Sequence, residues 1–183
     1  MNAHLPECKI IRLQDYDYSN EGLYFVTICC QDRIYVFGDI RDGEMIFNEA
    51  GRIADCAWKD LPNHNPHIQL DAWCIMPNHV HGIIIINDII SVGTGSQPVR
   101  LERSGLEPAP ATAYRKHGLP EIIRQFKTFS SRRINQLNGM QGIRLWQRSY
   151  YEHIIRNQKS YESIAGYIYG NPSKWLEDEY YME

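Results

Sequence analysis

Near the middle of the chain the sequence reads Met76-Pro77-Asn78-His79-Val80-His81-Gly82-Ile83-Ile84-Ile85-Ile86. The β-branched residues predict a β-strand, and Pro77-Asn78 predicts a turn just before it. Side chains alternate between the two faces of a strand, so His79 and His81 should project from one face and Val80 from the other. Two imidazoles held together on a rigid strand would form half of a metal site. The alternative is one packed core histidine and one surface histidine.

The segments around this strand predict an α+β fold. Residues 68–75 should form a strand that the turn at 76–78 joins to the histidine strand, so that the two pair antiparallel. Residues 22–30 are apolar on both faces and predict a central strand, and Asp42-Gly43 predicts a hairpin turn. Helical periodicity over 49–61, 119–138 and 158–170 completes the pattern. We expect a sandwich in which the helices pack on one face of an antiparallel sheet.

The length and composition fit one domain. The chain has 183 residues, of which 43% are apolar, enough to bury a core. Residues 1–20 are expected to form an N-terminal arm, 21–176 the domain and 177–183 a tail. The Gly- and Pro-rich stretch at about 88–118 predicts a flexible insertion within that domain.

Basic residues are concentrated in one part of the sequence. Residues 115–148 hold eight Lys or Arg and a single acid, Glu121, although the whole chain carries a net charge of −3. Such asymmetry predicts a basic face for a polyanion, the alternative being a solvated helix face. The candidate DNA-binding residues are Arg124, Lys127, Arg132, Arg133, Arg144 and Arg148, together with Tyr150.

Cysteine usage and hydropathy indicate a cytoplasmic protein. The five cysteines are odd in number and contain no C-x-x-C pair, which argues against a disulfide framework or a zinc ribbon. Residues 1–13 lack the apolar core of a signal peptide. The longest apolar run, 80–86, is much shorter than the ~20 residues that a membrane helix needs.

Three tyrosines on the last predicted helix are candidates for chemistry, namely Tyr161, Tyr167 and Tyr169. Tyr167 and Asn171 are four residues apart and share a helix face, whereas Tyr169 lies on roughly the opposite face. If this helix packs beside the histidine strand, the amide oxygen of Asn171 can serve as a third metal ligand, with the Tyr167 hydroxyl next to the metal. Alternatively, Tyr167 is an ordinary interface residue and Asn171 ends the helix before Pro172.

Four motifs in this order resemble the single-tyrosine HUH transposases, and most closely the REP-associated tyrosine transposases. They are Met76 to Gly82, Phe126-Lys127-Thr128, Leu145 to Asn157, and Tyr167-Ile168-Tyr169-Gly170-Asn171-Pro172-Ser173-Lys174-Trp175. The resemblance spans about residues 22–175. It implies a ferredoxin-like fold, His79 and His81 as the HUH histidines, Asn171 as the third metal ligand and Tyr167 as the nucleophile. The insertion at 91–113 does not conform to the family, so nothing is carried over there.

The implied chemistry suits these residue types. A divalent ion, Mg²⁺ or Mn²⁺, held by two imidazoles and an amide would polarise a phosphodiester. Attack by the tyrosine would leave a 5′-phosphotyrosine. A second 3′-hydroxyl could then attack this phosphotyrosine and rejoin the DNA without ATP. The expected partner is single-stranded or hairpin DNA, whose unstacked bases could stack on Tyr150, Tyr151 or Trp146. The resemblance leaves monomer and homodimer open.

Two other functions are compatible with the sequence. A zinc-type hydrolase also uses H-x-H on a strand, and His64 and His67 could supply its further ligands. The second alternative function is that of a domesticated module that binds hairpins without cleaving them. The complete set of His79, His81, Tyr167 and Asn171 favours cleavage.

Overall fold

A computed structural model describes residues 16–88 and 116–182 of the chain. Most of the expected N-terminal arm and nearly all of the expected insertion lie outside these residues. The proposed division of the chain into arm, domain, insertion and tail therefore stays a prediction.

The centre of the fold is a four-stranded antiparallel sheet in the order β4-β5-β1-β6. The strands are β1 (Gly22–Cys29), β4 (Ile68–Ile75), β5 (His79–Ile86) and β6 (Tyr151–Ile155). The expected pairing of 68–75 with the histidine strand is present, with Ile75 opposite Val80. β1 lies between β5 and β6, in agreement with its apolar character on both faces. This α+β, ferredoxin-like arrangement confirms the expected fold class.

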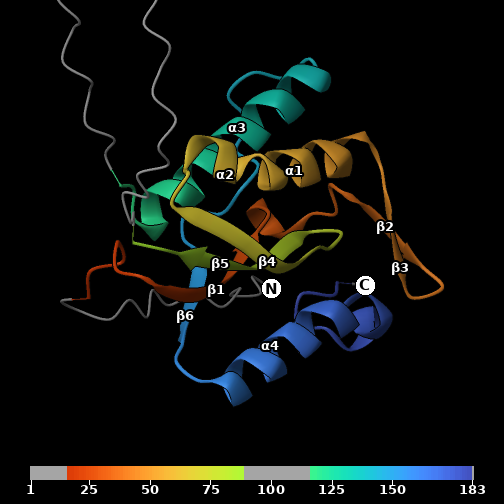
Figure 1. Ribbon diagram of the computed structural model, residues 1–183. Helices are drawn as coiled ribbons and strands as arrows, with labels where there is room; N and C mark the ends of the chain where they lie inside the picture. Colours follow the sequence, from red (N-terminus) through yellow and green to blue (C-terminus); the bar gives the residue numbers. More distant parts are fainter. Residues whose placement is uncertain (1–15, 89–115, 183) are drawn as a thin grey trace, which may run out of the picture.

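Helices cover both faces of the sheet, and in this detail the expectation of helices on one face was too simple (Figure 1). α1 (Glu49–Lys59), the short α2 (Leu61–His64) and α3 (Leu119–Leu137) lie on one side, and α4 (Gln158–Gly170) lies on the other. The larger core joins alternate residues of β1 and β5, such as Val26 and Ile84, to α1 and α3. The smaller core packs Ala165 and Ile168 of α4 against Phe25 and Ile83.

Side-chain caps fix the start of two helices. Asn48 accepts a hydrogen bond from the backbone N–H of Gly51 at 2.9 Å, and Asn157 accepts one from that of Ser160 at 2.9 Å; asparagine is a favoured residue at both cap positions. The start of α4 is thereby set directly after β6, so that the helix crosses back under the sheet.

Some local boundaries differ from the expected ones. The hairpin expected at Asp42-Gly43 consists of β2 (Gly38–Arg41) and β3 (Glu44–Phe47), with Asp42 and Gly43 both at positive φ in the turn. The helix expected over 49–61 ends at Lys59, and Pro62 lies in the first turn of the separate α2. On α3, Phe129 and Leu137 are exposed, whereas Leu119 and Ser130 are buried. Two short 3₁₀ helices, Gln31–Arg33 and Pro172–Glu177, follow β1 and α4.

One close packing contact fixes the histidine strand from behind. A Cβ added to Gly82 would collide with the indole of Trp58, a fully buried residue of α1. Only glycine lets the helix and the strand approach this closely. The position of β5 is therefore set by the larger core, on the face opposite to its histidines.

Candidate active site

His79 and His81 project from β5 towards the side of the sheet that α4 covers. Their Nε2 atoms are 3.0 Å apart and the ring centroids 4.5 Å apart. Both side chains are buried, with 0% and 1% of their surface exposed. The predicted alternation along the strand therefore does bring the two imidazoles together.

Hydrogen bonds to the outer ring nitrogens orient both imidazoles. Nδ1 of His79 lies 2.8 Å from Oδ1 of Asn78, whose Nδ2 donates to the carbonyls of Arg33 and Tyr180. Since the amide nitrogen of Asn78 is engaged in this way, Oδ1 accepts the proton of His79 Nδ1 and leaves the lone pair on Nε2. Nδ1 of His81 lies 2.8 Å from the hydroxyl of Thr27. Such outer partners are typical of histidines that bind metals.

Burial keeps both histidines neutral. It lowers the pKa of His81 to about 3, and burial together with the neighbouring His81 lowers that of His79 well below its usual range. The two neutral Nε2 atoms face each other at 3.0 Å, and with the ring protons on Nδ1 they would offer two lone pairs to one shared cation.

Tyr167 brings a phenol to the same point from α4. Its hydroxyl lies 3.1 Å from Nε2 of His81 and 3.5 Å from a carboxylate oxygen of Asp178. The side chain remains 43% exposed, so it is not locked in the interior. Partial burial, and then the charges of Asp178 and Glu179, raise the pKa of Tyr167 above its usual value. The phenol is therefore protonated at neutral pH.

Asp178 is a candidate ligand that the sequence did not single out. One of its oxygens and one ring nitrogen each of His79 and His81 all lie within 4.8 Å of one another. Asp178 also accepts a 2.8 Å hydrogen bond from Nδ2 of Asn171. That leaves Oδ1 of Asn171 buried with no hydrogen-bond partner in the described part of the chain. A cation would satisfy such an orphaned acceptor.

A small opening leads to the phenol. It has a volume of about 140 Å³ and is lined by Tyr167, Asn171 and Asp178 together with Gly166, Gly170 and Lys174. The two glycines are one helical turn apart, and a Cβ on either would meet no atom within 4 Å. Small residues on this face of α4 thus keep space beside the hydroxyl, with an exposed ammonium at its rim.

The segment after α4 covers the histidines. The ring of Tyr180 lies 4.5 Å from that of His79 and 6.0 Å from that of His81, and Trp175 lies 6.0 Å from His79. Arg33 donates to the carbonyl of Glu179 at 2.9 Å and packs over the Tyr180 ring. Since the imidazoles are fully buried under this cover, a phosphate can reach them only when it moves.

Comparisons with known proteins agree with this arrangement. No family model matches the sequence. An uncharacterized protein of Haemophilus influenzae is 37% identical over 185 residues, covering 100% of this chain and 97% of the relative. A "Putative REP-associated tyrosine transposase" of the same organism is 28% identical, covering 86% of this chain and 74% of the relative. A REP-associated tyrosine transposase solved with a REP hairpin superposes with a TM-score of 0.51 at 19% identity, covering 90% of this chain and 74% of that one.

The chain is similar in sequence and in fold to REP-associated tyrosine transposases.

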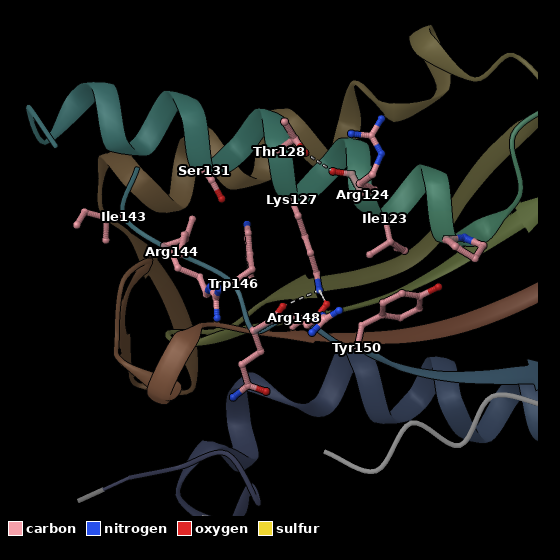
Figure 2. A pocket seen from close by; sticks show the side chains of 13 residues that line it. Ile123, Arg124, Lys127, Thr128, Ser131, Ile143, Arg144, Trp146, Arg148 and Tyr150 are labelled. Carbon is pink, nitrogen blue, oxygen red and sulfur yellow. Dashed lines mark hydrogen bonds between the residues drawn. The ribbon is translucent and has the colours of Figure 1, made fainter. Parts of the chain in front are cut away.

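The expected DNA-binding residues lie on the other side of the sheet. A groove of about 440 Å³ lies between α3 and residues 143–150. Arg124, Lys127, Arg144 and Arg148 are among the residues that line it (Figure 2). Arg124 is paired with Glu121 at 2.6 and 2.7 Å. Arg144 and Arg148 are exposed. Their role in DNA binding stays a prediction.

Lys127 and Tyr150 have a structural role in this groove. The ammonium of Lys127 donates to the carbonyls of Gln147 and Ser149 at 2.9 Å each and lies 5.4 Å from the centre of the Tyr150 ring (Figure 2). Tyr150 is only 9% exposed and belongs to the larger core. Lys127 therefore fixes the segment that leads into β6. Arg132 and Arg133 are exposed on α3, outside the lining of this groove.

The further histidines that a hydrolase would need have other hydrogen-bond partners in this structure. His64 lies 3.1 Å from Asp60 on the surface, and His67 lies 2.7 Å from the carbonyl of His117. Neither joins the group formed by His79, His81 and Asp178. Within residues 16–88 and 116–182, no helix is both long and apolar enough to cross a membrane.

Proposed function

We propose that this protein is a metal-dependent transposase and endonuclease that cleaves and rejoins single-stranded DNA near a hairpin through a 5′-phosphotyrosine. The observation that carries the proposal is the meeting of groups 86 residues apart, the Tyr167 hydroxyl 3.1 Å from Nε2 of His81 and beside His79. A phenol placed against a neutral imidazole pair is the arrangement that covalent catalysis on a phosphodiester requires.

His79, His81 and an oxygen of Asp178 or Asn171 would hold the divalent cation, Mg²⁺ or Mn²⁺. Two neutral nitrogens with a carboxylate or amide oxygen form a donor set that fits such an ion, and the orphaned Oδ1 of Asn171 supports the fit. When bound, the ion supplies charge that polarises the phosphate and eases attack on it.

Tyr167 supplies the nucleophile. Its oxygen attacks the phosphorus and forms a phosphodiester to tyrosine, while the bond from phosphorus to the 3′-oxygen of the preceding nucleotide breaks and that oxygen leaves as a 3′-hydroxyl. The phenol must lose its proton as it attacks, since its pKa lies above the usual value. With Nε2 of His81 and Oδ1 of Asn171 used as ligands, the carboxylate of Asp178 at 3.5 Å is the acceptor that remains beside the hydroxyl. Attack by another 3′-hydroxyl reverses these bonds.

The substrate that we propose is hairpin DNA with single-stranded flanks. A solved relative in the family carries a REP hairpin, and the arginines of the α3 groove offer positive charge for phosphates. A cytoplasmic location, where chromosomal DNA is available, goes with this proposal. The exposed arginines would bind the backbone and make affinity depend on salt.

A covalent adduct tests the proposal. The protein is incubated with Mn²⁺ and a REP hairpin labelled at its 3′ end, because the 5′-phosphotyrosine retains the fragment on the 3′ side of the cut. Denaturing electrophoresis should show a labelled protein band. Tyr167→Phe, His79→Ala and His81→Ala should abolish it.

The matched control is Tyr169→Phe, since Tyr169 lies on the same helix but is 69% exposed and takes no part in the site. This variant should form the adduct as the unmodified protein does. An adduct that persists in Tyr167→Phe would contradict the assigned nucleophile. Calorimetric titration with Mn²⁺ gives a readout without DNA: binding should be lost in His79→Ala.

A non-cleaving hairpin-binding module is the second candidate, and the covered histidines favour it. His79 and His81 are fully buried beneath Tyr180. If the protein bound the hairpin but formed no covalent adduct with any divalent metal ion, this alternative would be supported.

A further inference from the structure

A second groove lies on the same side of the sheet as the histidines. It has a volume of about 510 Å³ and runs between the edge strand β6 and the first half of α4. Phe25, Tyr151, His153, Asn157, Lys159 and Ser160 are among the residues that line it. None of them is in the group of candidate metal ligands.

The strand register places this groove next to the candidate active site. His81 is opposite Thr27 of β1, and Thr27 is opposite Tyr151 of β6, so the three side chains form one row across the sheet. Adjacent strands are about 4.8 Å apart, which puts Tyr151 about 10 Å from the histidine along this row. A strand of DNA with its phosphate at Tyr167 therefore has a neighbouring nucleotide over the groove.

Phe25 links the two places physically. Its ring stacks on His81 with the centroids 5.5 Å apart and meets Tyr167 edge-on at 6.4 Å. The same ring meets Tyr151 edge-on at 6.1 Å. Tyr151 is thus supported from one side by a buried ring while 42% of its surface is exposed. An aromatic ring held in this way offers a stacking surface at little entropic cost.

Polar groups surround the Tyr151 ring. His153 of β6 and Ser160 of α4 bring hydrogen-bonding groups to the groove, and the exposed Lys159 brings a positive charge. Asn157 uses Oδ1 to cap α4, and its amide also lines the groove. An aromatic face with mixed polar groups and one cation matches a nucleotide, whose base stacks while its phosphate meets the charge.

We propose that Tyr151 and Phe25 form the subsite for the base of a nucleotide next to the cleaved phosphate, in single-stranded DNA. The proposal rests on the proposed function, since it takes the position of that phosphate from Tyr167. Tyr151, rather than the buried Tyr150, is the residue on which the base stacks, because consecutive residues face opposite sides of the sheet.

Fluorescence of 2-aminopurine tests the subsite. The base analogue is placed in turn at each nucleotide flanking the cut in a REP hairpin with single-stranded tails, and binding is measured with Tyr167→Phe so that no cleavage intervenes. Binding should quench the analogue at one flanking position. Adding Tyr151→Ala should remove that quenching and weaken binding about tenfold, whereas Tyr151→Phe should preserve both.

Tyr169→Ala is the matched control and should leave affinity and quenching unchanged. An abasic nucleotide at the quenched position tests the same contact without altering the protein. It should weaken binding about tenfold when Tyr151 is present and cause no further loss in Tyr151→Ala. Equal affinity and equal quenching in Tyr151→Ala would overturn the proposal.

Failure of the subsite and failure of the proposed function give different results. If the Tyr151→Ala protein formed the adduct and bound DNA as tightly as the unmodified protein, the proposed subsite would be wrong and the proposed cleavage would stand. The opposite result is that no adduct forms, while quenching that depends on Tyr151 is found when the analogue is scanned through the tails. In that case the proposed cleavage would be wrong and the stacking contact would stand.

Discussion

Thr27 illustrates how one buried hydroxyl can control the histidine pair. It is 3% exposed, and its oxygen lies 2.8 Å from Nδ1 of His81, where it fixes the direction of the ring. Thr27→Val keeps the shape of the side chain and removes this partner. We expect affinity for Mn²⁺, measured by calorimetry, to fall about 10- to 100-fold.

Thr128→Val on the exposed side of α3 is the corresponding control, because its hydroxyl only bonds the carbonyl of Arg124 within the helix. Manganese affinity should be unchanged there. If Thr27→Val bound the ion as tightly as the unmodified protein, the hydroxyl would have no part in orienting His81.

Lys127 is expected to matter for stability as well as for DNA. Its ammonium donates to the carbonyls of Gln147 and Ser149, which a neutral side chain would leave unsatisfied. Lys127→Met should lower the free energy of unfolding by about 1.5–3 kcal/mol, the contribution of hydrogen bonds to a charged group. Urea denaturation measures this change. Arg132→Met, on an exposed side chain, should alter stability by less than about 0.5 kcal/mol.

Alternation and helical spacing sufficed to place some side chains in advance. They put His79 and His81 on one face of a strand, and the family resemblance singled out Tyr167, which the structure brings to them. Asp178 could not be found in this way. It follows an irregular 3₁₀ segment, and only the path of that segment returns its carboxylate to the site.

At the scale of elements, β5 packs most closely against α1 where Gly82 meets Trp58. Gly82→Ala would drive a methyl group into the Trp58 ring, so we expect a loss of about 1–3 kcal/mol in the free energy of unfolding. In a Trp58→Phe background the same substitution should cost less, because the smaller ring leaves room. Thermal or urea denaturation of the four proteins gives the comparison.

Gly166→Ala provides the opposite case. A Cβ there meets no atom within 4 Å, and α4 is helical at this position. The substitution should stabilise the protein by about 1 kcal/mol. If Gly166→Ala destabilised the protein, factors other than available space would determine how substitutions at these glycines affect stability.

Long, periodic elements were predictable, whereas the short strand β6 was not. α3 and α4 begin and end within one residue of the expected bounds, because many positions contribute to each periodicity. β6 has five residues and pairs along only one edge, so its sequence carries too little pattern to reveal a strand. The groove beside Tyr151 depends on that strand and was therefore missed.

At the scale of the whole molecule, three distant segments close the site. Residues Arg33 and Asn78 hold the carbonyls of Glu179 and Tyr180, and the Tyr180 ring lies against both histidines. Tyr180→Ala should open this cover. We expect faster modification of the histidines by diethyl pyrocarbonate and faster formation of the DNA adduct.

Tyr181→Ala removes a neighbouring ring that contacts Trp175 instead of the histidines, and it should change neither rate. Unchanged histidine reactivity in Tyr180→Ala would mean that the ring does not control access.

The contact between Gly82 and Trp58 also separates two constraints within one short motif. In the proposed function the imidazoles at 79 and 81 are needed for metal binding, whereas the glycine is needed because of an indole on the far side of the strand. A relative that does not cleave DNA could replace both histidines and would still have to keep the glycine for as long as the indole remained. Retention of that glycine alone is therefore no sign of a working nuclease.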